Sequence, residues 1–86
     1  MIRIGHLNIS LVTKDLGEDL LGMYDDQTAT IFIKPDLTPQ IRRSTIIHEC
    51  VHAISCMYGL ELSENQVRVL ESALIALVDN NPTLFS

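Results

Sequence analysis

The chain has 86 residues, of which 47% are hydrophobic and 20% charged, and its formal net charge at pH 7 is −5. This length suits one small domain over residues 1–86, and the composition is that of a globular protein rather than a disordered one. Six Lys and Arg residues are too few for the basic patch that nucleic-acid binding requires. The longest purely apolar run, Ala73 to Val78, is too short to cross a bilayer. Neither nucleic acid nor a membrane is therefore an expected partner.

The cysteines and the N-terminus indicate the cellular compartment. The first residues lack the apolar segment and the cleavage site of a signal peptide. Cys50 and Cys56 are six positions apart on one predicted helix, so they point to different faces and cannot pair with each other. Free thiols are typical of a reducing compartment, which predicts a cytoplasmic protein.

The first 35 residues read as strands and turns. Apolar and polar residues alternate in part over residues 2–13, and a slip of phase around Gly5-His6 predicts a bulge or a bend in a strand. Residues 20–24 form a short second strand. Residues 28–34 are rich in strand-forming residues and predict a third strand, paired with the second in a hairpin. A small antiparallel sheet is the expected result.

The longest predicted helix follows this sheet. Thr38 is a favourable N-cap, and Pro39 suits the first helical position. The helix is expected to run to Tyr58, because Gly59 is a favourable residue just past a helix end.

A second helix is predicted after a brief connector, residues 60–62. Ser63 and Gln66 have the spacing of a capping box, with Ser63 as N-cap. Apolar residues at helical spacing predict that this helix packs on the first one: Val67, Leu70, Leu74, Leu77 and Val78. Asn80-Asn81-Pro82 is expected to end it.

The middle of the first helix contains His48-Glu49-Cys50-Val51-His52, which is an H-E-x-x-H motif. Histidines four residues apart lie on one helix face, so both imidazoles can reach one metal ion. Glu49 projects from the edge of that face, where the general base of a zinc hydrolase lies. The alternative is that His48 and His52 are ordinary helix residues hydrogen-bonded to their neighbours.

A catalytic zinc ion usually has three protein ligands and one open position, so a third ligand is needed. Glu64 is a candidate if the connector runs back, extended, beside the first helix. Glu71 is an alternative, because it lies two turns further on nearly the same face and suits a tight turn and an antiparallel return. Glu61 and His6 are weaker candidates, since Glu61 has no helix to direct it and His6 could approach only from the sheet.

Several other residues have both a functional and a structural interpretation. Tyr24 and Tyr58 could each donate a hydrogen bond to an oxyanion, but a core position is preferred for both. Cys56 is interpreted as a small buried residue. The acids before and within the hairpin form no metal-binding loop and are interpreted as solvated charges: Asp15, Glu18, Asp19, Asp25 and Asp26.

About residues 20–84 of this chain resemble the ImmA/IrrE metallopeptidases, and most closely the very short versions encoded by bacteriophages and other mobile elements. The resemblance rests on these segments: Leu21-Gly22-Met23-Tyr24, Thr30-Ile31-Phe32-Ile33, Arg43-x-Thr45-Ile46-Ile47-His48-Glu49-x-x-His52-Ala53-Ile54, and Asp79-Asn80-Asn81-Pro82. After the zinc helix the family has Glu-x-x-Ala-x-x-Phe-Ala, where this chain has Glu64-x-x-Val67-x-x-Leu70-Glu71. The resemblance thereby assigns the family's glutamate ligand to Glu64. The chain departs from the pattern at Val67, Leu70 and Glu71, and it lacks the usual long insertion after the second histidine.

The resemblance implies a zinc peptidase with a minimal zincin-like α+β fold, in which a small antiparallel sheet packs on the active-site helix and a second, C-terminal helix. The expected metal ligands are His48, His52 and Glu64, with Glu71 as the alternative third ligand and Glu49 as the general base. The expected partner is a protein or peptide substrate. The strand Ile31-Phe32-Ile33 is expected to form the edge of the sheet beside the cleft, where the substrate could add as an extended strand. Two rivals are a non-catalytic module that zinc only staples, and a metal-free structural protein.

Overall fold

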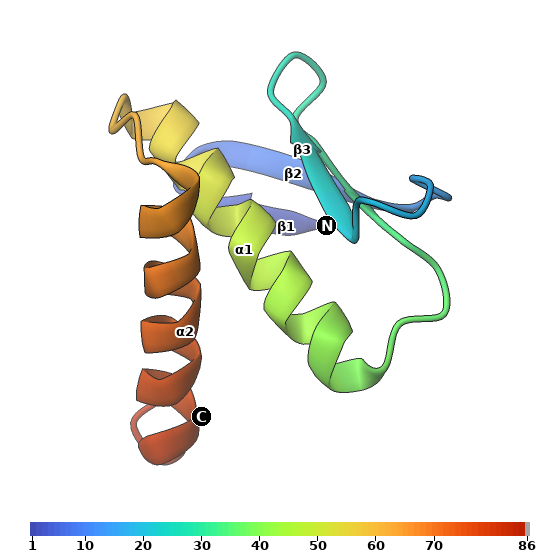
Figure 1. Cartoon of the computed structure of the whole chain (residues 1–86). Helices are drawn as coiled ribbons and strands as arrows, with labels where there is room; N and C mark the ends of the chain where they lie inside the picture. Colours follow the sequence, from blue (N-terminus) through green and yellow to red (C-terminus); the bar gives the residue numbers. More distant parts are fainter. Residues whose placement is uncertain (86) are drawn as a thin grey trace.

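The computed structural model describes residues 1–85. These residues form four strands and two helices: β1 (Ile2–Ile4), β2 (Leu7–Thr13), β3 (Gly22–Asp25), β4 (Thr30–Ile33), α1 (Pro39–Tyr58) and α2 (Glu64–Asn80). The helix α1 packs across one face of the sheet, and α2 lies beside α1 on the side away from β3 (Figure 1). The predicted α+β class is confirmed. In the part of the chain described, neither helix is long and apolar enough to cross a membrane.

The sheet is mixed, which corrects the prediction of an antiparallel one. Its strand order is β1-β2-β4-β3. The pairs β1–β2 and β3–β4 are antiparallel, but β2 and β4 are parallel, with Leu11 opposite Ile31. The reason is topological. The loop after β2 leads to β3 at the far edge of the sheet, and the β3–β4 hairpin then places β4 between β2 and β3. Consequently β3 is an edge strand, and the expectation that Ile31–Ile33 forms the edge is wrong.

The first predicted strand is divided in two, so the prediction of a single strand with a bulge or bend is also wrong. Gly5 and His6 form a tight turn between β1 and β2, in which Ile4 and Leu7 pair directly. Gly5 has a φ of 58°, a left-handed conformation that glycine adopts without steric cost. The phase slip in the sequence was therefore the mark of a hairpin.

The ends of both helices lie where the capping residues predict. The Thr38 side chain accepts a hydrogen bond from the first turn of α1, and Gly59 follows the helix with a left-handed φ of 65°. At the start of α2, the Gln66 N–H donates to Ser63 Oγ at 3.1 Å, and the Ser63 N–H donates to Gln66 Oε1 at 2.9 Å. This reciprocal capping box satisfies two backbone donors that a helix start would otherwise leave free.

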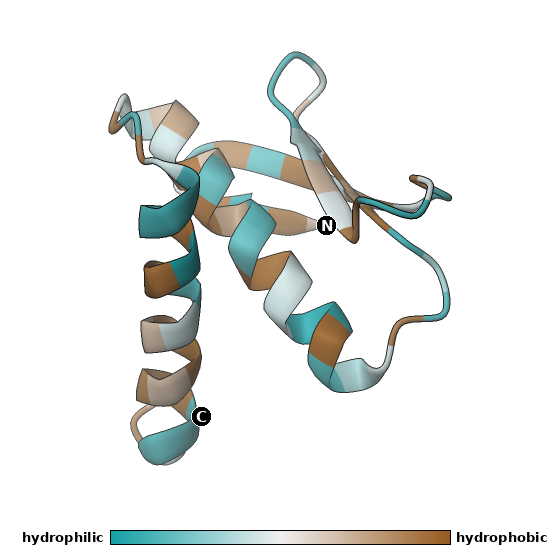
Figure 2. Cartoon of the chain, viewed as in Figure 1, coloured by the Kyte–Doolittle hydropathy of each residue, from teal (hydrophilic) through white to brown (hydrophobic). Residues whose placement is uncertain are grey.

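The main core lies between the sheet and α1. Ile9, Ile31 and Ile33 from the central strands pack with Ala53 of α1, and all four are buried. α2 contributes much less, because Val67 is its one buried residue in the range described. Four other apolar residues that were expected to pack on α1 are exposed: Leu70, Leu74, Leu77 and Val78. Apolar residues occur along α2 (Figure 2), so this helix contacts α1 but leaves much of its apolar surface exposed.

Candidate metal centre

The two histidines of the H-E-x-x-H motif lie one turn apart on α1. Their ring centroids are 5.0 Å apart, with an angle of 64° between the ring planes. Both rings are partly buried, His48 more than His52. The i, i+4 spacing on a helix thus presents two imidazoles in the same direction.

The connector after α1 brings the start of α2 back to these histidines. The Leu60 N–H donates to the Ser55 carbonyl oxygen at 2.9 Å, and the Leu62 N–H donates to Ser55 Oγ at 3.0 Å. Because two connector amides are bound to one residue inside α1, the chain reverses along the helix. The connector does run back beside the first helix, but it is not extended throughout, because Glu61 has a left-handed φ of 54°.

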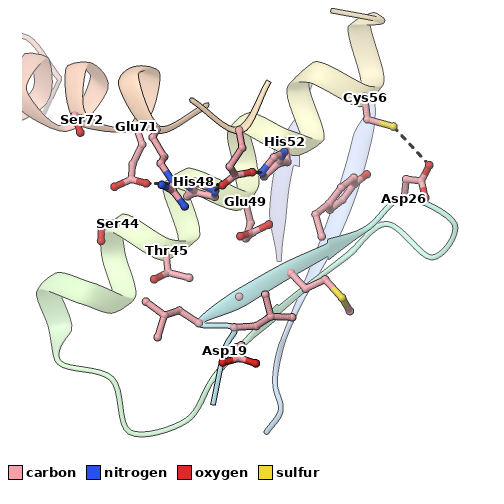
Figure 3. A pocket seen from close by; sticks show the side chains of 17 residues that line it. Asp19, Asp26, Ser44, Thr45, His48, Glu49, His52, Cys56, Glu71 and Ser72 are labelled. Atoms are coloured by element: carbon pink, nitrogen blue, oxygen red, sulfur yellow. Dashed lines mark hydrogen bonds and ion pairs between the residues drawn. The ribbon is translucent and has the colours of Figure 1, made fainter. Parts of the chain in front are cut away.

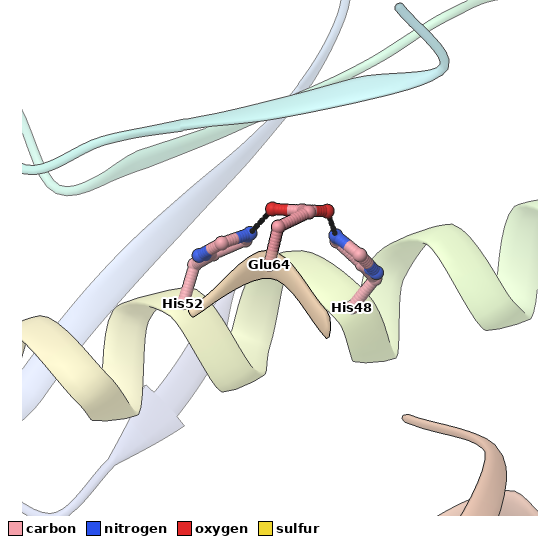
Figure 4. A group of neighbouring side chains, drawn as sticks. All are labelled: His48, His52 and Glu64. Atoms are coloured by element: carbon pink, nitrogen blue, oxygen red, sulfur yellow. Dashed lines mark hydrogen bonds and ion pairs between the residues drawn. The ribbon is translucent and has the colours of Figure 1, made fainter. Parts of the chain in front are cut away.

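Glu64, the first residue of α2, places its carboxylate between the two imidazoles (Figure 4). Its Oε1 lies 2.7 Å from His48 Nε2, and its Oε2 lies 3.0 Å from His52 Nε2. Donor atoms of these three residues all lie within 4.8 Å of one another. These three residues could therefore hold a metal ion. The name metal group is used below for His48, His52 and Glu64.

The donor set fits a divalent metal chemically. Two imidazole nitrogens and one carboxylate are a known protein ligand set of catalytic zinc, which leaves a fourth position for water. A tetrahedral ion with bonds of about 2.1 Å separates its ligand atoms by about 3.4 Å, so the 2.7 and 3.0 Å contacts need only open slightly. Burial raises the pKa of Glu64, but the charges and hydrogen bonds of His48 and His52 outweigh it and lower this pKa overall. The lowered pKa favours the ionised form of Glu64, which is the form of a carboxylate that can bind a metal ion.

Glu49 lies beside this group but is not a member of it. Its side chain is buried, with the whole residue 7% exposed, and a backbone hydrogen bond from Tyr24 holds its carboxylate. Burial raises the pKa of Glu49 above its ordinary value, while the nearby charges of His48 and His52 act in the opposite direction. A buried carboxylate with a raised pKa, next to three residues that could hold a metal ion, could act as a general base.

An open cleft of about 1010 Å³ lies in front of the metal group, between α1, the β3 edge and the N-terminal half of α2 (Figure 3). Its polar walls include His48, Glu49, His52 and Glu64, together with Thr45. Its apolar walls come from the start of β3 and the preceding loop: Leu20, Leu21, Met23 and Tyr24. Asp19 and Asp26, interpreted from sequence as solvated charges, also line the cleft.

The remaining candidate ligands lie elsewhere. Glu71 does not contact the Nε2 atoms; its Oε1 lies 2.7 Å from His48 Nδ1, the other nitrogen of that ring. Glu61 is an exposed connector residue with a φ of 54°. His6 is in the β1–β2 turn and lines a separate hollow with Tyr58 and Met57. None of these three belongs to the group whose donor atoms converge.

Two interpretations based on burial need correction. Tyr58 is 60% exposed, so it is not a core residue. Cys56 is exposed, not buried, and its Sγ lies 3.7 Å from an Asp26 carboxylate oxygen in the cleft. Tyr24 packs against the core and also lines the cleft. Burial and nearby negative charges raise the pKa of Tyr24, so its phenol remains a proton donor.

Gly22 is a residue of this site that the sequence interpretation passed over. A Cβ at this position would lie 2.6 Å from Thr45 Cγ2 and 3.2 Å from Glu49 Cγ. Because Gly22 has no side chain, β3 can approach α1 closely beside Glu49, whose carboxylate is buried. An isolated glycine inside a predicted strand is a known sign of close backbone approach, so the signal was present.

Replacing Gly22 with alanine is expected to lower the free energy of unfolding by about 1–3 kcal/mol, because the added methyl group would clash with the Thr45 side chain. Thermal and denaturant unfolding of the purified variant measure this change. Thr45→Ser removes the clashing methyl and keeps the hydroxyl that donates to the Ile41 carbonyl oxygen. The double variant should recover part of the loss, and equal instability of the single and double variants would contradict this contact.

Comparison of the sequence with protein-family models and with curated proteins found no match.

Proposed function

We propose that this protein is a zinc-dependent peptidase that hydrolyses peptide bonds of a protein or peptide substrate. The observation that supports it most is the convergence of His48, His52 and Glu64 beside the buried Glu49, on the wall of an open cleft. The resemblance to the short ImmA/IrrE metallopeptidases supports the same reaction and the choice of zinc. The free thiols of both cysteines support action in a reducing compartment such as the cytoplasm.

Each residue of the site has a defined role in this proposal. His48, His52 and Glu64 would hold the zinc ion, which when bound would lower the pKa of water and polarise a carbonyl group. Glu49 accepts the proton of the attacking water and delivers it to the leaving amine. The Tyr24 phenol, a proton donor in the same cleft, is available to stabilise negative charge on the substrate oxygen.

The outer edge of β3 is the proposed binding surface for the substrate backbone. Within the sheet of residues 1–85, β3 pairs with β4 on one side and with no strand on the other. An extended peptide can add to such an edge through main-chain hydrogen bonds. The exposed side chains of Leu21 and Met23 beside this edge favour an apolar residue in the substrate.

Metal analysis combined with peptide profiling tests the proposal. We expect one zinc ion per chain, and cleavage of a proteome-derived peptide library that stops on chelation and resumes when zinc is added back. Mass spectrometry identifies the cleaved bonds and shows whether apolar residues are enriched next to them. A protein that takes up no zinc, even when zinc is supplied, would contradict the metal site as well as the reaction.

A zinc-stapled binding module is a second candidate, and the exposed apolar surface of α2 favours it. Leu70, Leu74 and Leu77 are each 38–47% exposed on one helix, and exposed apolar surface is a feature of protein-binding sites. In that case zinc binds with the same stoichiometry but no peptide in the library is cleaved.

A further inference from the structure

His48 has a carboxylate at each nitrogen of its ring. Glu64 Oε1 lies 2.7 Å from Nε2, and Glu71 Oε1 lies 2.7 Å from Nδ1. Both acids come from α2, seven residues apart and therefore on nearly the same helix face. Glu71 is the better shielded of the two, with its side chain 23% exposed against 53% for Glu64. The contact of Glu71 with Nδ1 is thus a partly buried one (Figure 3).

The two nitrogens of an imidazole have different tasks when the ring binds a metal. The nitrogen that faces the ion must be free of its proton, and the other nitrogen then keeps a proton that needs an acceptor. A carboxylate acceptor fixes the tautomer, holds the ring plane and raises the basicity of the metal-binding nitrogen. At His48 the acceptor position is filled by Glu71.

Geometry separates this role from that of a ligand. The donor group that could hold an ion consists of His48, His52 and Glu64, and Glu64 meets both histidines at Nε2. Nδ1 and Nε2 point away from opposite sides of the ring, so a group hydrogen-bonded to Nδ1 lies on the side away from an ion at Nε2. Glu71 therefore contacts the histidine rather than the ion.

We propose that Glu71 is a positioning residue, which accepts a hydrogen bond from His48 Nδ1 and thereby directs a deprotonated Nε2 at the metal position. The role rests on the proposed function only in requiring an ion at the group of three residues, and it does not require peptide hydrolysis. It also separates two acids that the sequence left as alternatives: Glu64 binds the ion, and Glu71 orients one of its histidines.

Zinc affinity in matched variants tests this assignment. We expect Glu71→Ala to weaken zinc binding about 10–100-fold, the usual effect of losing an outer carboxylate, and Glu64→Ala to weaken it by a larger factor. Glu71→Gln should lie between the wild type and Glu71→Ala, because its amide oxygen can still accept from Nδ1. Glu61→Gln is the control, since it removes a carboxylate from the exposed connector, and it should bind zinc as the wild type does.

The tautomer of His48 gives a readout that a general loss of stability would not produce. In ¹⁵N-labelled, zinc-loaded protein, long-range ¹H–¹⁵N spectra should show His48 protonated at Nδ1 and bound through Nε2. In Glu71→Ala the Nδ1 proton resonance should be lost through exchange with water, while circular dichroism shows the fold retained. His52 serves as the internal reference, because Glu64 lies at its Nε2 and, among residues 1–85, no carboxylate contacts its Nδ1.

Several outcomes would overturn the proposal. Unchanged affinity and an unchanged His48 spectrum in Glu71→Ala would show that the contact has no effect on the metal site. A loss of zinc as large as that in Glu64→Ala would make Glu71 a ligand, and a wild-type protein that binds no zinc would remove the site altogether. An absence of peptide hydrolysis, with these affinities and spectra as expected, would count against the proposed function alone.

Discussion

Glu49→Gln is expected to lower the rate of peptide hydrolysis by about 10²–10⁴-fold while leaving zinc bound, since that is the usual contribution of a general base. Glutamine has the same shape as glutamate and can still accept the backbone hydrogen bond from Tyr24 that holds the native carboxylate. It cannot accept the proton of the attacking water. Steady-state hydrolysis of a peptide found by library profiling, together with zinc content, measures both parts of this prediction.

Glu64→Gln is the matched control for Glu49→Gln, because it makes the same chemical change at a residue of the metal group. It should lose zinc and activity together, and added zinc should restore some of each. If Glu49→Gln also lost its zinc, Glu49 would be a ligand and its role as a base would be wrong. If the Glu49 variant kept full activity, another group would have to accept the proton.

Removal of zinc is expected to lower the melting temperature by roughly 15–30 °C. An ion that binds only the folded state, at a free concentration 1,000 times its Kd, stabilises that state by about 4 kcal/mol. In a domain of this size each kcal/mol changes the melting temperature by about 4–8 °C. Thermal unfolding followed by circular dichroism, with zinc and then with chelator, measures the shift.

Two histidine variants show whether the zinc-dependent change in melting temperature comes from the metal group. His52→Ala removes a member of the metal group and should abolish most of the zinc-dependent shift. His6→Ala alters the histidine of the β1–β2 turn, outside that group, and should retain the full shift. A wild-type melting temperature that is the same with zinc and with chelator would favour the metal-free structural protein.

The features that the sequence predicted best depend on neighbouring residues. Thr38 and Gly59 determine the ends of α1 through contacts within one turn, and the capping box of Ser63 and Gln66 does the same for α2. The sheet was predicted less well, because strand order depends on contacts distant in sequence. The strand predicted over residues 28–34 is present over Thr30–Ile33, but no local pattern shows that β4 lies between β2 and β3.

Within the site, the sequence identified the residues better than their contacts. The i, i+4 spacing placed His48 and His52 on one face, and the connector argument brought Glu64 to them. Glu64 and Glu71 share a helix face, so spacing could not tell which nitrogen of His48 each would meet. Likewise, helical position alone could not show that Cys56 is exposed, since this depends on where the β3–β4 turn ends.

The weak apolar attachment of α2 has a consequence for the dynamics of the protein. In α2 Val67 is buried and Ile75 half-buried, and three acids of this helix also bind α1: Glu64 and Glu71 contact His48, and Asp79 pairs with Arg43 at 2.5 Å. Exposed ion pairs such as Arg43–Asp79 contribute at most about 1 kcal/mol. A helix held in this way can detach in a partial opening that leaves the sheet and α1 folded.

Hydrogen exchange should therefore divide the chain into two cooperative units. Without metal, the amides of α2 are expected to exchange faster than those in the middle of α1, because they need only the smaller opening. Under the proposed function a zinc ion would join Glu64, at the start of α2, to the two histidines of α1 that this carboxylate contacts, so its binding should slow exchange in α2 most of all. The same ion would then have two effects at once: it completes the site, and it makes α2 unfold together with the rest of the domain.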